Sequence, residues 1–322
     1  MKPKAAASGT ERVILIHDGA IDEYMATMLL FTMGNVDLQG IVIVPGNCLP
    51  EIGMQTAWKV QAYLGRTSVP LCLSEARGFN PFPWEYRQDC IKQANVPALQ
   101  TYGPNPAWPP YPVAAPWLKQ FFRSLTGTVT VLCLCPLTPL SDLLRDMPEV
   151  QAKIKRLVWM GGAIDVAGNL DPATLPSVVA NPYAEWNVFW DPAAVEYVFS
   201  NTKFPIFMFP LDITNNAKVS DKFLTELLLK SKTHRYADLA YQSYRAVTGA
   251  FYRMWDTTVA AYLDRPGLFS SPQEIQVSVL TSGALAGTIK RATGGRIIHA
   301  ITEFADLDGF YAYVVDQFST PS

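Results

Sequence analysis

The sequence predicts an α/β fold: a Rossmann-like, open and mostly parallel sheet flanked by helices. Strand-like runs alternate along the chain with helical stretches, which is typical of a parallel sheet covered on both faces. Hydrophobic residues make up 49% of the 322 residues, and no Gly/Ser linker or charge block divides the chain. We therefore expect one domain, residues 1–322, with a functional site at the C-terminal ends of the strands.

Each predicted element has a local signal. The strands are short apolar runs, and several helices are opened by proline or closed near glycine. In residues 22–33, apolar side chains recur at 25, 26, 28, 29, 30 and 33, which is a helical face rather than strand alternation. The predicted strands are 13–17, 38–44, 129–135, 156–160 and 205–210, and the predicted helices are 22–33, 51–64, 117–125, 137–146 and 192–200.

The remaining segments have weaker signals. Residues 80–116 are proline-rich, with six prolines in 103–116, and we expect them to be irregular. Aromatic residues interleaved with proline in 80–86 and 103–116 favour a rigid loop over a site, and a polyproline ligand for a partner domain is the alternative. After residue 219 the pattern is helical to about 264, then two or three β-like runs occupy 275–301 and a closing helix spans 305–318.

Composition excludes several classes of function. Lys and Arg total 26 against 28 Asp and Glu, and the one local basic cluster, 230–235, is too short to follow a phosphate backbone, so nucleic acid is not an expected partner. No apolar run reaches the ~20 residues of a membrane span. Residues 1–10, which we expect to be disordered, lack the hydrophobic stretch of a signal peptide. We therefore expect a soluble, cytoplasmic protein without membrane partners.

The five cysteines are odd in number and scattered, which favours reduced thiols over a disulfide framework. Cys133 and Cys135 lie in a β-rich apolar run. Because no second Cys or His pair follows them, we expect buried strand thiols rather than a soft-metal site.

The most informative stretch is 16–23, where the apolar run 13–16 gives way to three carboxylates, Asp18, Asp22 and Glu23. Burying three negative charges so close together is unfavourable unless a cation neutralises them, and hard oxygen ligands favour calcium or magnesium. Asp22 could instead be only the N-cap of the following helix. Because capping leaves Asp18 at the strand end unexplained, we favour a metal site.

Two further clusters carry polar side chains. Glu185 and Asn187 offer donors and acceptors suited to sugar hydroxyls, although both could merely satisfy the backbone of a turn. Asp256 follows Trp255 in a charge-poor helical stretch and could be an N-cap. A phosphohydrolase with Asp18 as its nucleophile is disfavoured, because the chain has no Gly-rich phosphate loop with Lys and Ser or Thr.

These motifs, in this order, resemble those of the nucleoside hydrolase family, the calcium-dependent enzymes that split nucleosides into ribose and a free base. The family signature Asp-x-Asp-x-x-x-Asp-Asp stands here as residues 16–23, Ile-His-Asp-Gly-Ala-Ile-Asp-Glu. The other matches are Gly46-Asn47, Met160-Gly161-Gly162, Gly168-Asn169, Ala184-Glu185-Trp186-Asn187 and Trp255-Asp256. The resemblance covers nearly the whole chain.

The resemblance implies a role for each matched residue. Asp18 would be the general base that deprotonates a calcium-bound water. The calcium ligands would be Asp18, Glu23, Asp256 and the backbone carbonyl of Leu134. The ribose would be held by Asp22, Asn47, Asn169, Glu185 and Asn187. Carboxylates and amide oxygens beside the sugar would stabilise an oxocarbenium-like transition state.

The base-binding residues resemble those of the family's purine-preferring branch. Trp255 stands where pyrimidine-tolerant members carry a histidine, although it could instead be a core anchor. The branch stacks the purine between aromatic rings, which here would be Trp255 and, from the 80–86 loop, Tyr86, Trp84 or Phe82. We expect a homodimer that hydrolyses inosine, guanosine or adenosine for purine salvage, with a preference for 6-oxopurines.

The sequence departs from the family pattern in four places. Ile16 and Glu23 replace signature aspartates, and Ala20 and Asn47 differ from the residues of the purine branch. The extra methylene of Glu23 displaces its carboxylate by on the order of 1.5 Å, so the backbone or the calcium coordination must adjust. A relative that binds nucleosides without cleaving them is therefore the alternative function.

Overall fold

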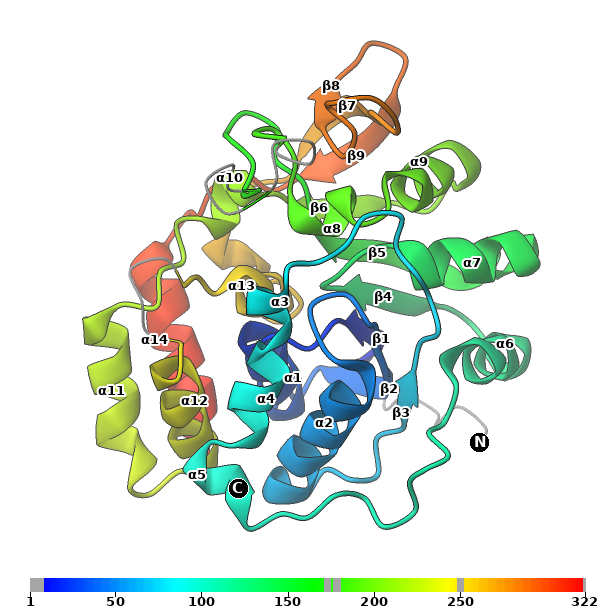
Figure 1. Ribbon diagram of the computed structural model, residues 1–322. Helices are drawn as coiled ribbons and strands as arrows, with labels where there is room; N and C mark the ends of the chain where they lie inside the picture. Colours follow the sequence, from blue (N-terminus) through cyan, green and yellow to red (C-terminus); the bar gives the residue numbers. More distant parts are fainter. Residues whose placement is uncertain (1–8, 171–174, 176–180, 248–251, 321–322) are drawn as a thin grey trace.

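The computed structural model describes residues 9–170, 175, 181–247 and 252–320. Within them, a nine-stranded sheet has the order β3-β2-β1-β4-β5-β6-β9-β7-β8 (Figure 1). Neighbours from β3 to β9 pair in parallel, whereas β7 pairs antiparallel with β9 and β8. The strands are β1 (Glu11–His17), β2 (Val36–Ile43), β3 (Leu71–Leu73), β4 (Val129–Cys133), β5 (Ile154–Met160), β6 (Ile206–Phe209), β7 (Gln273–Val279), β8 (Ile289–Arg291) and β9 (Arg296–Ala300).

Helices cover both faces of the sheet (Figure 1). The first layer contains α1 (Ile21–Thr32), α2 (Pro50–Leu64), α4 (Asp89–Ala94), α5 (Pro97–Gln100), α10 (Leu211–Thr214), α11 (Asp221–Ser231), α12 (Arg235–Arg245), α13 (Trp255–Ala261) and α14 (Leu307–Phe318). The second contains α6 (Ala114–Ser124), α7 (Thr138–Asp146), α8 (Trp186–Phe189) and α9 (Pro192–Asn201). The other helical segments are α3 (Trp84–Arg87) and the 3-10 turns Pro148–Lys153 and Pro266–Leu268.

The strands contribute to two hydrophobic cores, because successive side chains of a strand point to opposite faces of the sheet. In β1, Val13 and Leu15 belong to the core beneath the first helix layer. Ile14 and Ile16 belong to the core beneath the second layer. Both faces of β1 are therefore buried, which explains why the sequence of this strand is a continuous apolar run.

The strand order determines where a ligand can bind. From β1 the chain adds β2 and β3 on one side, then returns to place β4 on the other side of β1. At such a switch point the connections diverge and leave a crevice outside the carboxyl ends of the strands. The residues that follow the strands are held together there, since Leu134 N–H donates to Ile16 O and Val44 N–H donates to His17 O, each at 2.8 Å.

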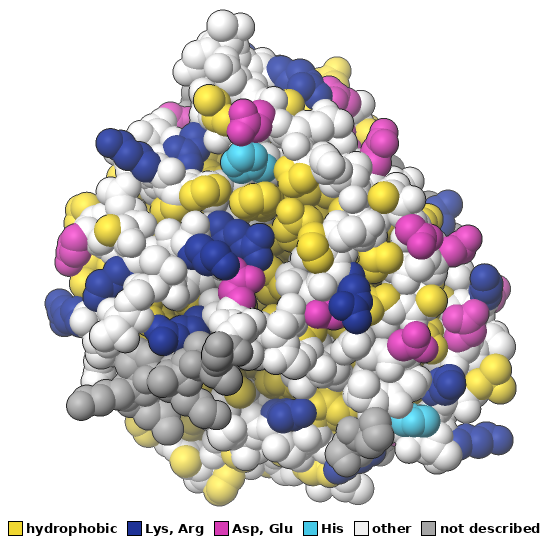
Figure 2. All heavy atoms as spheres, turned by 180° about the vertical axis from the view of Figure 1, so that it is seen from behind, with side chains coloured by type: hydrophobic (Ala, Val, Ile, Leu, Met, Phe, Trp, Pro, Cys, Tyr) yellow, Lys and Arg dark blue, Asp and Glu magenta, His cyan; other side chains and the backbone are white. Residues whose placement is uncertain are grey.

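The surface carries charges of both signs. Figure 2 shows Lys and Arg side chains intermixed with Asp and Glu on the face opposite to the view of Figure 1. Mixed charges of this kind produce no extended field of one sign. In the described part of the chain, no helix combines the length and the apolar character needed to cross a membrane.

The predicted fold class is confirmed, and the five predicted strands correspond to β1, β2, β4, β5 and β6. The β-like runs near the end of the chain are the three strands β7, β8 and β9. The prediction of free, buried thiols is also confirmed for all five cysteines. Of the segment expected to be disordered, residues 1–8 lie outside the described residues.

The irregular structure expected for residues 80–116 was wrong, one strand was not predicted, and the predicted helical stretch 219–264 consists of separate helices. Residues 80–116 contain α3, α4 and α5 and the start of α6, because Pro83 precedes α3 and Pro97 opens α5, where a missing N–H costs no helical bond. Strand β3 was not predicted, since three residues are too few to show a periodic pattern. The helical stretch 219–264 is divided into α11, α12 and α13.

We predict that Gly40→Ala in β2 destabilises the fold by about 1–3 kcal/mol, the usual cost of overpacking. A Cβ at this position would lie 2.4 Å from Cη2 of Trp117, a ring that is itself stacked on Phe121. Urea unfolding measures the change. The control is Gly103→Ala, whose Cβ would meet nothing within 4 Å. Equal stability of the two variants would contradict the packing described for β2.

Candidate active site

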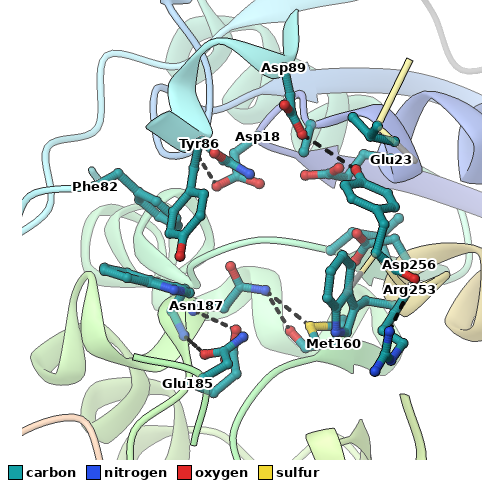
Figure 3. A pocket seen from close by; sticks show the side chains of 18 of the residues that line it. Asp18, Glu23, Phe82, Tyr86, Asp89, Met160, Glu185, Asn187, Arg253 and Asp256 are labelled. Carbon is teal, nitrogen blue, oxygen red and sulfur yellow. Dashed lines mark hydrogen bonds between the residues drawn. The ribbon is translucent and has the colours of Figure 1, made fainter. Parts of the chain in front are cut away.

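A cavity of about 700 Å³ lies at the carboxyl edge of the sheet. It is bounded by residues that follow β1, β2, β4 and β5 and by α8 and α13 (Figure 3). The predicted site residues that line it are Asp18, Glu23, Asn47, Phe82, Tyr86, Leu134, Asn169, Glu185, Asn187, Trp255 and Asp256. Two predicted residues, Asp22 and Trp84, do not line it.

Three carboxyl groups line one side of this cavity. Asp18 follows β1, Glu23 lies in the first turn of α1 and Asp256 lies in the first turn of α13. Their exposed fractions are 2%, 2% and 6%. Burial raises the pKa of Asp18 to about 6, and burial together with the neighbouring carboxylates raises the pKa of Glu23 and of Asp256 well above the ordinary range. The three groups therefore resist carrying full negative charge together.

The protein partly compensates the charge of Asp18. Its Oδ2 accepts the backbone N–H of Asn47 at 2.8 Å. The guanidinium of Arg87 also lowers the pKa of Asp18, although burial has the larger effect. Arg87 donates to the backbone carbonyls of Cys48 (2.9 Å) and Pro45 (3.4 Å) and so fixes the loop that carries Asn47.

Asp22 is fully buried and bonded to the protein. Its Oδ1 accepts the hydroxyls of Tyr244 (2.5 Å) and Thr257 (2.8 Å). Its Oδ2 accepts the backbone N–H groups of Asp256 (2.6 Å) and Thr257 (3.0 Å). The N-cap of α1 is Ala20, so the alternative that Asp22 caps its own helix is wrong; it caps α13 instead. Asp22 thereby fixes the helix end that carries Trp255 and Asp256.

The polar residues on the opposite side are held by backbone groups. Glu185 is the N-cap of α8 and accepts the N–H groups of Asn187 (2.9 Å) and Gly162 (2.8 Å). Asn187 donates to the carbonyl of Met160 (3.1 Å), and Asn169 accepts the N–H of Trp186 (3.2 Å). Glu185 and Asn187 therefore form hydrogen bonds with backbone groups of a turn, as the alternative interpretation expected, and they also line the cavity. Burial raises the pKa of Glu185 to about 7.

Aromatic rings form two walls of the cavity. On one side, Phe82 stacks on Trp186 with ring centroids 5.0 Å apart, and Tyr86 meets Trp186 edge-on at 5.6 Å. On the other side, Trp255 meets Tyr252 edge-on at 5.1 Å. Trp84 is 57% exposed and outside the cavity. Of the two candidates at the tip of the loop, Tyr86 is therefore the one that faces the cavity (Figure 3).

Sequence reasoning missed several residues of the cavity, among them Asp89, Lys92, Tyr252 and Arg253. The first two lie on α4, within the segment that was predicted to be irregular. Their i,i+3 spacing of opposite charges is common on helix surfaces and does not indicate a site. The sequence around Tyr252 and Arg253 contains no motif that indicates a site, apart from their position just before Trp255.

The three carboxyl groups match the donor chemistry of a hard divalent cation. Oε2 of Glu23 and Oδ1 of Asp256 are buried and find no hydrogen-bond partner among the described residues. Unpaired carboxylate oxygens are costly unless a cation binds them. In the described part of the chain, however, no three His, Cys, Asp or Glu side chains are already gathered as a metal site. A cation would therefore have to draw these groups together.

The fold and this cavity define an α/β protein with an acidic site at the sheet's switch point. The chain belongs to the inosine-uridine preferring nucleoside hydrolase family, whose model matches residues 13–312. The non-specific ribonucleoside hydrolase RihC of Salmonella paratyphi A is 30% identical over 320 residues, which cover 95% of this chain and 97% of the relative.

Solved structures have the same fold. The inosine-uridine preferring nucleoside hydrolase of Bacillus anthracis superposes with a TM-score of 0.86 at 29% identity, covering 96% of this chain and 99% of that one. A purine-preferring ribonucleoside hydrolase of Gardnerella vaginalis shares the fold with a TM-score of 0.75 at 18% identity, covering 96% of this chain and 99% of that one. The predicted family is thus confirmed.

We predict that the free energy of unfolding of the metal-free protein decreases as the pH rises from about 4 to about 7. Asp18 and Glu185 have raised pKa values, about 6 and about 7, so the folded state holds protons that the unfolded state releases above about pH 4. Calcium should raise the melting temperature more at about pH 7.5 than at about pH 5, because it compensates the charged form. Thermal unfolding with and without calcium measures both effects. An equal calcium-induced rise in melting temperature at the two pH values would contradict the expectation that a cation binds the ionised carboxyl groups.

Proposed function

We propose that this protein hydrolyses the N-glycosidic bond of purine ribonucleosides and releases ribose and the free base. Nucleoside hydrolase activity follows from family membership; the purine preference, the cation and the individual roles are the proposal. Its main support is the placement of the buried carboxyl groups Asp18, Glu23 and Asp256 in one cavity with neutral polar groups and two aromatic walls. Purine salvage is the use we propose for the reaction.

A divalent cation, most simply calcium, would be held by Asp18, Glu23, Asp256 and the backbone carbonyl of Leu134. When bound, such an ion lowers the pKa of a coordinated water and provides a hydroxide-like nucleophile near neutral pH. Asp18 would accept the proton of the attacking water as general base. Its bond to the backbone of Asn47 orients the carboxylate for that step.

The ribose would lie between the carboxyl groups and the turn that contains Glu185. Asn187, Asn169 and Asn47 would bind its hydroxyls, and the buried Oδ1 of Asn47 has no hydrogen-bond partner among the described residues. As the bond from C1′ to the base breaks, its electron pair leaves with the base and positive charge develops on the sugar. The carboxylate of Glu185 would stabilise that charge at short range in a buried site.

The leaving base would stack between Tyr86 and Trp255. Stacking on two electron-rich rings favours a large, flat purine and eases protonation of a ring nitrogen as the bond breaks. The related enzymes carry names that include non-specific and inosine-uridine preferring types. The proposal of a purine preference therefore rests on the aromatic walls of this chain and not on the names of its relatives.

We predict that the protein releases reducing sugar from inosine and guanosine when calcium is present. Asp18→Asn should lower kcat by at least about 100-fold, since a general base contributes about 10²–10⁴-fold. Sugar release is the measurement, and Asp146→Asn, which changes an exposed surface carboxylate, is the control. Absence of sugar release from every purine nucleoside with calcium present would reject the proposal.

We predict that Trp255→Ala lowers kcat/KM for inosine by about 10-fold or more while affecting uridine less, because the larger purine ring loses more stacking. The matched control is Trp84→Ala, which removes the exposed indole outside the cavity and should leave both substrates unaffected. Equal losses for inosine and uridine would show that Trp255 does not select purines.

The second candidate function is a nucleoside-binding protein without turnover. Two observations favour it. Glu23 replaces a signature aspartate. Among the described residues, no three His, Cys, Asp or Glu side chains are arranged to hold a metal ion. It predicts that nucleosides raise the melting temperature while no sugar is released at any calcium concentration. Under the first proposal, stabilisation and sugar release occur together.

A further inference from the structure

An ion pair lies in the cavity beside the two aromatic walls. Lys92 Nζ lies 2.7 Å from Oδ1 of Asp89, and both residues line the cavity. The side chain of Asp89 is 10% exposed, whereas that of Lys92 is 41% exposed. The pair therefore presents a buried acceptor next to a donor that can still move.

The ion pair adjoins both walls through Asp89. Asp89 follows Tyr86, a member of the first wall, by three residues. Its Oδ2 is 3.5 Å from the hydroxyl of Tyr252, whose ring contacts Trp255 of the second wall. Figure 3 shows Asp89 on the same side of the cavity as Glu23 and Asp18. A flat ring between Tyr86 and Trp255 would therefore direct one edge toward Asp89.

Both members of the pair keep hydrogen-bonding capacity for a ligand. An ionised carboxylate offers about four acceptor positions and an ammonium offers three donors. Among the described residues, the carboxylate of Asp89 has contacts from Lys92 and from the distant hydroxyl of Tyr252, and the ammonium of Lys92 donates to Asp89 alone. Nothing in the proposed mechanism of sugar release uses these free positions.

We infer that Asp89 and Lys92 select 6-oxopurines by binding the N1 and O6 edge of the base, an inference that rests on the proposed function. N1–H of hypoxanthine or guanine would donate to Asp89, and O6 would accept from Lys92. The amino group of guanine adds a second donor beside N1–H, which makes the contact with the carboxylate bidentate. Guanosine should therefore bind at least as tightly as inosine.

Adenine is disfavoured because the hydrogen-bond donor and acceptor at positions 1 and 6 are exchanged relative to a 6-oxopurine. Its N1 is an acceptor and would face the carboxylate of Asp89, while its N6 amino group is a donor and would face the ammonium of Lys92. Both contacts place like groups against each other, and the cost is greater at Asp89, whose carboxylate is largely buried. Inosine and adenosine, which differ only at this edge, form a matched pair of ligands for the test.

The test is calorimetric binding of guanosine, inosine and adenosine to the full-length protein with divalent cations removed, so that no metal-dependent turnover occurs and Asp18 stays intact. Asp89→Asn should weaken guanosine binding at least tenfold, because it removes a charged acceptor. Adenosine binding should stay unchanged or become tighter, since an asparagine amide can pair with N1 and N6 of adenine. Lys92→Met should weaken inosine and guanosine binding and spare adenosine.

The control is Asp146→Asn, which breaks another 2.7 Å Lys–Asp contact, that with Lys119 on the surface. It should leave all three affinities unchanged. Equal weakening of guanosine and adenosine by Asp89→Asn would overturn the inference, as would a parent protein that binds adenosine as tightly as inosine. Because binding is read without catalysis, a protein that selects inosine over adenosine but releases no sugar would disprove the proposed function alone.

Discussion

Three carboxyl groups are buried in one cavity at the carboxyl ends of β1 and β4, and the surrounding structure depends on how their charge is compensated. Asp18, Glu23 and Asp256 come from a strand end and two helices, so their closeness is a product of the tertiary fold. Desolvation and mutual repulsion act against folding whenever all three are ionised. The protein supplies the backbone N–H of Asn47 and a nearby guanidinium to Asp18, while Oε2 of Glu23 and Oδ1 of Asp256 have no hydrogen-bond partner among the described residues. We propose that a cation binds these two oxygens.

A fourth carboxylate, Asp22, makes this arrangement rigid. It lies at the start of α1, yet its bonds reach the first turn of α13 and the hydroxyl of Tyr244 on α12. One buried side chain therefore joins three helices and fixes both Asp256 and Trp255. Asp22, which the family resemblance assigns to the ribose, does not line the cavity and instead serves as a helix cap for the site.

The sheet, its apolar strands and most of the site could be predicted from the sequence, because β1 shows a continuous apolar run and the polar motifs follow strand ends. The roles within the site could not. That Asp22 caps α13 rather than α1 depends on contacts across more than 230 residues. That Tyr86 rather than Trp84 faces the cavity depends on the orientation of α3, a helix of four residues in a segment expected to be irregular.

Calcium titration of the metal-free protein tests the central claim most directly, provided that proton release is measured in buffers of different ionisation enthalpy. Asp18, Glu23 and Asp256 have raised pKa values without metal. At about pH 6.5, one calcium ion should therefore bind per chain and displace protons from these groups. Failure to bind calcium, or binding that releases no proton at this pH, would contradict the role assigned to the buried carboxyl groups.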